Sequence, residues 1–121
     1  MAKKILIAED EKAMARAVEL KLQHEGFETQ IAGNGEEALK YLHEDKFDLV
    51  LLDLMMPKVD GFEVLKTLQE EKSKIPVVVT SNLSQAEDIK KTKDLGAIDF
   101  LVKSNVSLSQ IIDTIKKILK I

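Results

Sequence analysis

The 121-residue sequence contains no cysteine and only two histidines. The absence of cysteine excludes a disulfide framework, thiolate-bound zinc or iron–sulfur centres, and any cysteine nucleophile. The histidines, His24 and His43, do not have the spacing of a metal site, and we expect both to lie at the surface. No apolar run approaches the ~20 residues that a membrane-spanning helix requires.

The N-terminus is basic, but the apolar stretch after Lys4 covers only Ile5 to Ala8 before acidic residues follow. A secretory signal needs a longer apolar core, so we predict a cytoplasmic protein. The formal net charge of −3 gives no electrostatic reason to expect nucleic acid as a direct partner. The length suits a single domain over residues 1–121, and the 45% hydrophobic fraction is typical of a globular chain.

Short apolar runs of β-strand character alternate with longer segments of helical periodicity. The predicted strands are Ile5–Ala8, Thr29–Ala32, Leu49–Leu52, Val77–Val79 and Phe100–Val102. The predicted helices are Glu11–Glu25, Asn34–Asp45, a segment from Asp60 to at least Leu68, Ser84–Leu95, and a segment from Ser107 to about Leu119. This alternation predicts βαβ crossovers and a parallel sheet covered by helices on both faces. We expect a three-layer, doubly wound α/β fold of the flavodoxin-like type, with strand order 2-1-3-4-5.

Capping sequences mark the beginnings of three predicted helices. Asn34 precedes an acidic residue by three positions, while Ser84 and Ser107 precede Glu87 and Gln110 by the same interval. A side-chain oxygen at such a position accepts a hydrogen bond from the first turn of the helix, and a Glu or Gln three residues later bonds back. We therefore expect these helices to begin next to Asn34, Ser84 and Ser107.

Charged and hydroxyl side chains follow the strands that are expected to be neighbours. Glu9 and Asp10 follow the first strand, Asp53 the third, Ser81 the fourth and Lys103 the fifth. Ligands of open α/β sheets bind at the carboxyl ends of the strands, so these residues are expected to converge. Two like charges ~4 Å apart repel by about 4 kcal/mol at an effective dielectric near 20, so the acids repel strongly unless a cation or a proton relieves them. Carboxylates without His or Cys favour Mg²⁺, and the whole set suits a phosphoryl group that an Asp could itself accept.

At these positions the sequence resembles the receiver domain of two-component response regulators, and is similar to the single-domain chemotaxis type. The resemblance runs from about Lys4 to Leu119 and rests on four motifs in order. They are Ile7-Ala8-Glu9-Asp10, Asp53-Leu54-Met55-Met56-Pro57-Lys58-Val59-Asp60-Gly61, Pro76-Val77-Val78-Val79-Thr80-Ser81, and Phe100-Leu101-Val102-Lys103.

The resemblance implies a role for each residue of the predicted site. Asp53 would accept a phosphoryl group from a phosphohistidine on a sensor histidine kinase or a histidine phosphotransfer protein. Glu9 and Asp10 would hold Mg²⁺ together with Asp53 and the backbone carbonyl of Met55, and Lys103 would contact the phosphoryl oxygens. Such a domain is a signalling switch that undergoes its own phosphorylation and slow dephosphorylation, rather than an enzyme with sustained turnover.

The resemblance also implies a switch. The Ser81 hydroxyl would move to the phosphate and leave space that Phe100, which has no hydroxyl of its own, could enter by packing alone. The helix at 84–95 is the least apolar, with only Ala86, Ile89 and Leu95 to bury, and weakly anchored elements are those able to move. We expect this helix, the fifth strand and the last helix to form the output face, with the basic run 90–93 as a solvated surface.

One departure from the family pattern concerns the loop after Lys103. Ser104 stands where the family usually has proline, so the cis Lys–Pro bond of the family cannot form. A cis Lys–Ser bond would cost ~2.5–4 kcal/mol, and we expect a trans bond or an altered loop.

Three other functions fit parts of the sequence. A haloacid-dehalogenase-like phosphatase also uses an Asp at a strand end, but it needs a second Asp two residues on, where Met55 stands. A dinucleotide site is suggested by Gly33-Asn34-Gly35-Glu36-Glu37-Ala38, although the motif follows the second strand and a capped helix explains it. A receiver-like interaction module without phosphorylation would not need the intact acids and Lys103.

Overall fold

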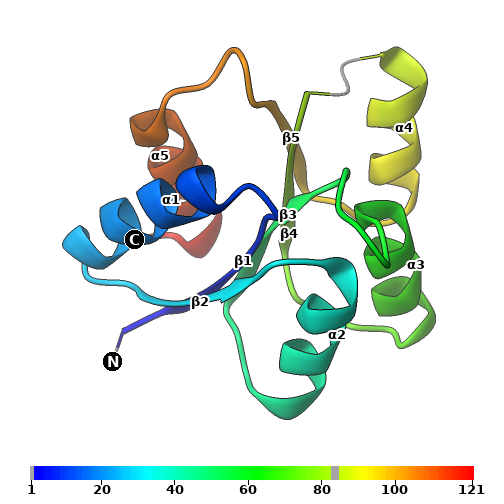
Figure 1. Ribbon diagram of the computed structural model, residues 1–121, viewed down its shortest axis with the longest axis horizontal. Coiled ribbons are helices and arrows are strands. Elements are labelled where there is room, and N and C mark those ends of the chain that lie inside the picture. Colours follow the sequence, from blue (N-terminus) through cyan, green and yellow to red (C-terminus); the bar gives the residue numbers. More distant parts are fainter. Residues whose placement is uncertain (1, 83–84) are drawn as a thin grey trace.

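The computed structural model describes residues 2–82 and 85–121, in which strands and helices alternate along the chain (Figure 1). The strands are β1 (Lys4–Ala8), β2 (Glu28–Ala32), β3 (Leu49–Asp53), β4 (Val77–Ser81) and β5 (Asp99–Val102). The helices are α1 (Lys12–His24), α2 (Gly35–Glu44), α3 (Gly61–Glu70), α4 (Ala86–Asp94) and α5 (Leu108–Leu119).

The five strands form one parallel sheet in the order β2-β1-β3-β4-β5, which confirms the predicted doubly wound α/β fold. Helices α1 and α5 cover one face, and α2, α3 and α4 cover the other (Figure 1). The order reverses between β1 and β3, so the carboxyl ends of these two strands open onto the crevice where ligands of such sheets bind.

Two apolar cores lie on the two faces of the sheet. Alternate residues of β3 supply them: Val50 and Leu52 pack under α2 and α3, whereas Leu49 and Leu51 pack under α1 and α5. Every residue of β3 and β4 is buried, as expected of central strands in a parallel sheet. These two strands therefore hold the residues at their carboxyl ends on a rigid base.

The predicted N-caps Asn34 and Ser107 are confirmed, but the Glu37 carboxylate accepts from the N–H of Gly33, at 2.9 Å, and not from that of Asn34. Asn34 and Asp60 accept hydrogen bonds from the backbone N–H of Glu37 and Glu63, at 2.8 and 2.9 Å. Ser107 and Gln110 form the predicted reciprocal capping box. The box predicted at Ser84 lies outside the described residues; Gln85 is the N-cap of α4.

Helix α4 and strand β5 are the least buried pair of consecutive elements. Ile89 and Leu95 are half-buried as predicted, but Ala86 is exposed and the buried residue of α4 is Thr92, so that part of the prediction is wrong. Thr92 can be buried because its hydroxyl donates to the carbonyl of Ile89, at 2.8 Å. No helix among the described residues is long and apolar enough to cross a membrane.

Candidate functional site

The carboxyl edge of the sheet brings together acidic side chains from two neighbouring strands. Glu9 and Asp10 follow β1, and Asp53 is the last residue of β3. One carboxylate oxygen from each of the three lies within 4.8 Å of the other two. Glu9 and Asp53 are 5% and 4% exposed, whereas Asp10 faces solvent. The sequence predicted this convergence because parallel strands end at the same edge.

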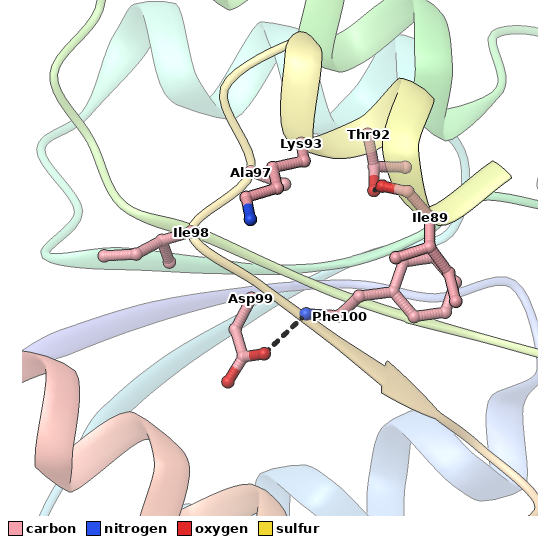
Figure 2. Close-up of a pocket in the computed structure, with 7 residues that line it drawn as sticks. All are labelled: Ile89, Thr92, Lys93, Ala97, Ile98, Asp99 and Phe100. Atoms are coloured by element: carbon pink, nitrogen blue, oxygen red, sulfur yellow. Dashed lines mark hydrogen bonds between the residues drawn. The ribbon is translucent and has the colours of Figure 1, made fainter. Parts of the chain in front are cut away.

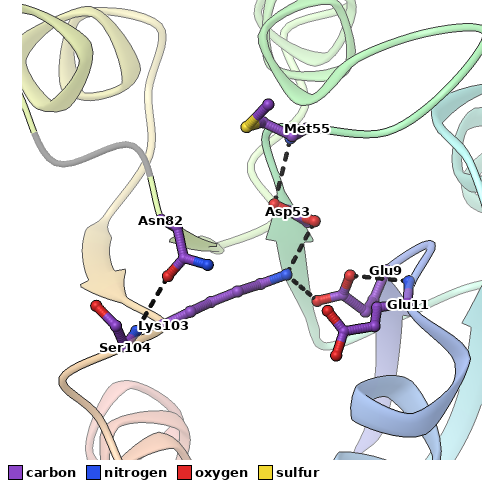
Figure 3. A network of polar contacts seen from close by, with 7 residues as sticks. All are labelled: Glu9, Glu11, Asp53, Met55, Asn82, Lys103 and Ser104. Carbon is purple, nitrogen blue, oxygen red and sulfur yellow. Dashed lines mark hydrogen bonds and ion pairs between the residues drawn. The ribbon is translucent and has the colours of Figure 1, made fainter.

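Lys103 reaches into this group from the end of β5 (Figure 3). Its Nζ atom forms an ion pair with Glu9 and donates a hydrogen bond to Oδ2 of Asp53, at 3.0 Å. The Lys103 side chain is only 13% exposed, so these contacts are shielded from water more than surface ion pairs are. One ammonium group therefore forms ion pairs with two buried carboxylates.

Burial and the contacts of Lys103 act in opposite directions on the pKa values of the pocket. Burial raises the pKa of Glu9 to about 7, against the hydrogen bond from Lys103 that lowers it. Burial also disfavours the charged form of Lys103, but hydrogen bonds to Glu9 and Asp53 outweigh this and raise its pKa. Oxygen donors held close together, with one of them in water, are the donor set that Mg²⁺ takes. The residues present therefore fit a magnesium ion.

Backbone groups fix the orientation of the two buried acids. Oδ1 of Asp53 accepts from the N–H of Met55 at 3.2 Å, and Oε2 of Glu9 accepts from the N–H of Glu11 at 3.1 Å. Behind Asp53, the first residue of α3 is Gly61, where an added Cβ would lie 2.5 Å from the Asp53 carbonyl oxygen. Only glycine lets α3 begin this close to the end of β3.

The predicted switch residues lie on β4 and β5. Ser81 is fully buried and pairs in register with Val102, one residue beyond Thr80, which pairs with Asp53. Phe100 is half-buried and lines a cavity of about 210 Å³ between α4 and β5, shown in Figure 2. Ser81 is not among the residues that line this cavity, so the cavity is separate from the space that the Ser81 hydroxyl would leave. Met55 has a 59% exposed side chain on the loop after β3.

The loop after β5 has the trans geometry that the missing proline predicts. The described residues include no cis peptide bond, so Lys103–Ser104 is trans. The N–H of Ser104, which a proline would lack, donates to Oδ1 of Asn82 at 3.1 Å (Figure 3). This contact could not be predicted from the sequence, because the two residues lie 22 positions apart in different loops.

The three lysines of the basic run on α4 are exposed, as predicted, but the helix also makes two contacts that the sequence did not predict. Thr92 is buried, and Nζ of Lys91 lies 4.3 Å from the centre of the Phe62 ring on α3. A second contact joins the same helices, since the Gln69 side-chain amide donates to the carbonyl of Asp94 at 3.0 Å. Side-chain contacts from α3 therefore help to hold α4 in place.

Of the two turn glycines in the dinucleotide-like motif, Gly35 has a packing role. Gly35 begins α2, and a Cβ there would lie 2.0 Å from the carbonyl oxygen of Val59 in the loop after β3. Close approach of two backbones accounts for that glycine, and Asn34 accounts for the start of the helix. The motif needs no nucleotide to explain it.

A parallel sheet with buried acids, a lysine and a hydroxyl at its carboxyl edge defines a class of doubly wound phosphoryl-binding domains. Within it, the model of the response regulator receiver domain matches residues 5–116, so the chain belongs to that family. Known receiver structures agree. The Francisella response regulator 1452 receiver domain has a TM-score of 0.93 and 30% identity, covering 98% of this chain and 97% of that one. A CheY-like receiver domain protein from Methanospirillum hungatei JF-1 has a TM-score of 0.93 and 25% identity, covering 99% and 95%.

Curated relatives with similar sequences are longer proteins. The alkaline phosphatase synthesis transcriptional regulatory protein PhoP of Bacillus subtilis is 37% identical over 103 residues, which are 85% of this chain and 43% of that protein. The probable transcriptional regulator ycf27 of Cyanophora paradoxa is 41% identical over 101 residues, 84% of this chain and 42% of that protein. The chain thus spans less than half the length of the curated relatives it matches.

Proposed function

We propose that residues 1–121 act as one phosphorylatable switch of a two-component system, with Asp53 as the acceptor. The observation that carries this proposal is the contact of the Lys103 ammonium with Asp53 and Glu9 beside Asp10. A lysine can stabilise the negative charge of a phosphoryl group on a neighbouring carboxylate that is buried and held by a backbone hydrogen bond. The donor would be a phosphohistidine of a sensor histidine kinase or a histidine phosphotransfer protein.

The transfer step is a displacement at phosphorus. A carboxylate oxygen of Asp53 attacks, the P–N bond breaks with its electron pair remaining on the donor imidazole, and an acyl phosphate forms. Lys103 would contact the phosphoryl oxygens. Glu9, Asp10, Asp53 and the backbone carbonyl of Met55 would hold Mg²⁺, which when bound would neutralise charge developing on those oxygens.

Signal output would follow from contacts made by the phosphorylated state. The Ser81 hydroxyl would turn toward the phosphoryl group and leave space that Phe100 could enter by packing alone. A change of this kind shifts an existing equilibrium between two conformations. A protein partner would then recognise the face formed by α4, β5 and α5, with no direct contact to nucleic acid by this domain.

Two alternatives remain distinguishable from this switch. A haloacid-dehalogenase-like phosphatase would release phosphate with sustained turnover, which the position of Met55 disfavours because it supplies no general acid. A receiver-like module that works without phosphorylation would take up no phosphoryl group. The ion pairs of Lys103 with Glu9 and Asp53 favour the switch over the module without phosphorylation.

The deciding experiment combines Mg²⁺ and a small phosphoryl donor with intact-mass measurement. We expect one added phosphoryl group on the wild type and none on Asp53→Asn. The control Asp113→Asn, which makes the same change at an exposed position of α5, should also gain one. Chelation of Mg²⁺ should suppress the gain. Labelling that survives Asp53→Asn would contradict the assignment, and steady phosphate release would favour the phosphatase.

A further inference from the structure

The end of β4 is joined to the turn after β5 by two consecutive hydrogen bonds. The N–H of Lys103 donates to the carbonyl of Ser81 at 3.0 Å, as a continuation of the β4–β5 ladder. The next N–H, that of Ser104, donates to the side-chain Oδ1 of Asn82 at 3.1 Å. Asn82 therefore extends the ladder by one bond beyond the point where the backbone pairing of β4 and β5 ends.

This side-chain bond lies beside the residues that would handle the phosphoryl group. Asn82 directly follows Ser81, and Ser104 directly follows Lys103 (Figure 3). Lys103 has a long, flexible side chain, and its ammonium must reach Glu9 and Asp53 from the far edge of the sheet. Fixing the peptide on either side of Lys103 limits the directions from which that side chain can start.

We propose that Asn82 is a positioning residue for phosphoryl acceptance, acting on Lys103 through the N–H of Ser104. A proline after the lysine would restrict the backbone at that position. In this chain the hydrogen bond from Ser104 to Asn82 would restrict the backbone instead. The proposal rests on the proposed function, since it concerns the group that contacts the incoming phosphoryl oxygens. Asn82 itself lies outside the pocket formed by the acids and Lys103.

The first test compares phosphorylation rates of Asn82→Ala with the wild type and with Asn105→Ala. Asn105 is an exposed residue of the same turn, for which the described part of the chain gives no side-chain hydrogen bond. A neutral hydrogen bond supports a loss of about two- to tenfold in rate for Asn82→Ala, and we expect none for Asn105→Ala. Equal rates for all three proteins would overturn the proposal.

A double-mutant cycle tests whether the bond to Ser104 carries the effect. Ser104→Pro removes the donor, so adding Asn82→Ala to it should cause no further loss of rate. Amide exchange at Ser104 should quicken in Asn82→Ala, as expected when its acceptor is gone. If Asn82→Ala costs as much with Pro at position 104 as with Ser, Asn82 acts by another route and the proposal is wrong.

A measurement that does not need phosphorylation separates this proposal from the proposed function. The Lys103 ammonium should give an ordered NMR signal through its contacts with Glu9 and Asp53. Asn82→Ala should broaden that signal, and Asn105→Ala should leave it unchanged. A wild type that takes up no phosphoryl group would end the proposed function, while an unchanged Lys103 signal in Asn82→Ala would by itself end the positioning role.

Discussion

The centre of the sheet is more deeply buried than its β5 edge and the neighbouring helix α4. Strands β3 and β4 bury every residue, and α5 buries Ile111, Ile112 and Ile115. Helix α4 buries only Thr92, and β5 has an exposed or half-buried residue at each position. Elements with few buried apolar contacts open at low free-energy cost. Asp53 thus stands on the firm part, and its lysine partner on the looser part.

The most direct way to break this comparison is to truncate one side chain in each region. Leu52→Ala on β3 removes a fully buried side chain and should cost about 3–5 kcal/mol of unfolding free energy. Ile89→Ala on α4 removes a half-buried one and should cost about 1 kcal/mol, because solvent already reaches the site. Urea denaturation measures both. Equal losses would show that α4 is as firmly packed as the sheet.

A smaller loss should follow from crowding the backbone behind Asp53. In Gly61→Ala the new Cβ meets the Asp53 carbonyl oxygen, which cannot move as a flexible side chain can, so we expect about 1–3 kcal/mol of destabilisation. Gly33→Ala is the matched control, since its Cβ meets only the Glu37 carboxylate, at 3.8 Å. Thermal unfolding and phosphorylation rate should both change for Gly61→Ala alone. Wild-type stability and phosphorylation rate in Gly61→Ala would show that the backbone between β3 and α3 can shift at little cost.

The attachment of α4 should be weakened further by removing Lys91. Lys91→Gln loses the cation–π contact with Phe62, worth about 0.5–1 kcal/mol at an exposed site. Lys90→Gln makes the same charge change on an exposed neighbour without that ring contact. Amide exchange should quicken in α4 for Lys91→Gln and stay unchanged in β3. Equal exchange in the two variants would mean that the ring contact does not hold α4.

The smallest effect is expected from the ion pair between α1 and α5 on the firm side. The side-chain hydrogen bond from Lys116 lowers the pKa of Glu25 below its ordinary value of 4.5. A lowered folded-state pKa adds stability above the unfolded-state pKa, and that stability is lost as pH falls through the folded-state value. Lys116→Gln should therefore bring the NMR-measured pKa of Glu25 back toward 4.5. The unfolding free energy should then fall slightly less steeply as the pH is lowered. An unchanged pKa would show that the pair does not form in solution.

The sequence predicted those features that depend on periodicity and on strand ends. Parallel strands must end at one edge, so Glu9, Asp53 and Lys103 could be placed together before any coordinates were known. The contact between Asn82 and Ser104 could not, since it depends on how two separate loops lie in space. The burial of Thr92 was missed because its polarity suggested exposure, whereas a hydrogen bond within the helix satisfies its hydroxyl.

The double contact of Lys103 has a consequence for how the protein would endure changing conditions. Three carboxylates lie close together here, and like charges repel one another unless a positive charge is near. Because one tethered ammonium already answers two of them, the resting fold carries its own counter-ion. We therefore expect the chain to stay folded when Mg²⁺ is removed, whereas phosphoryl acceptance by Asp53 would be lost.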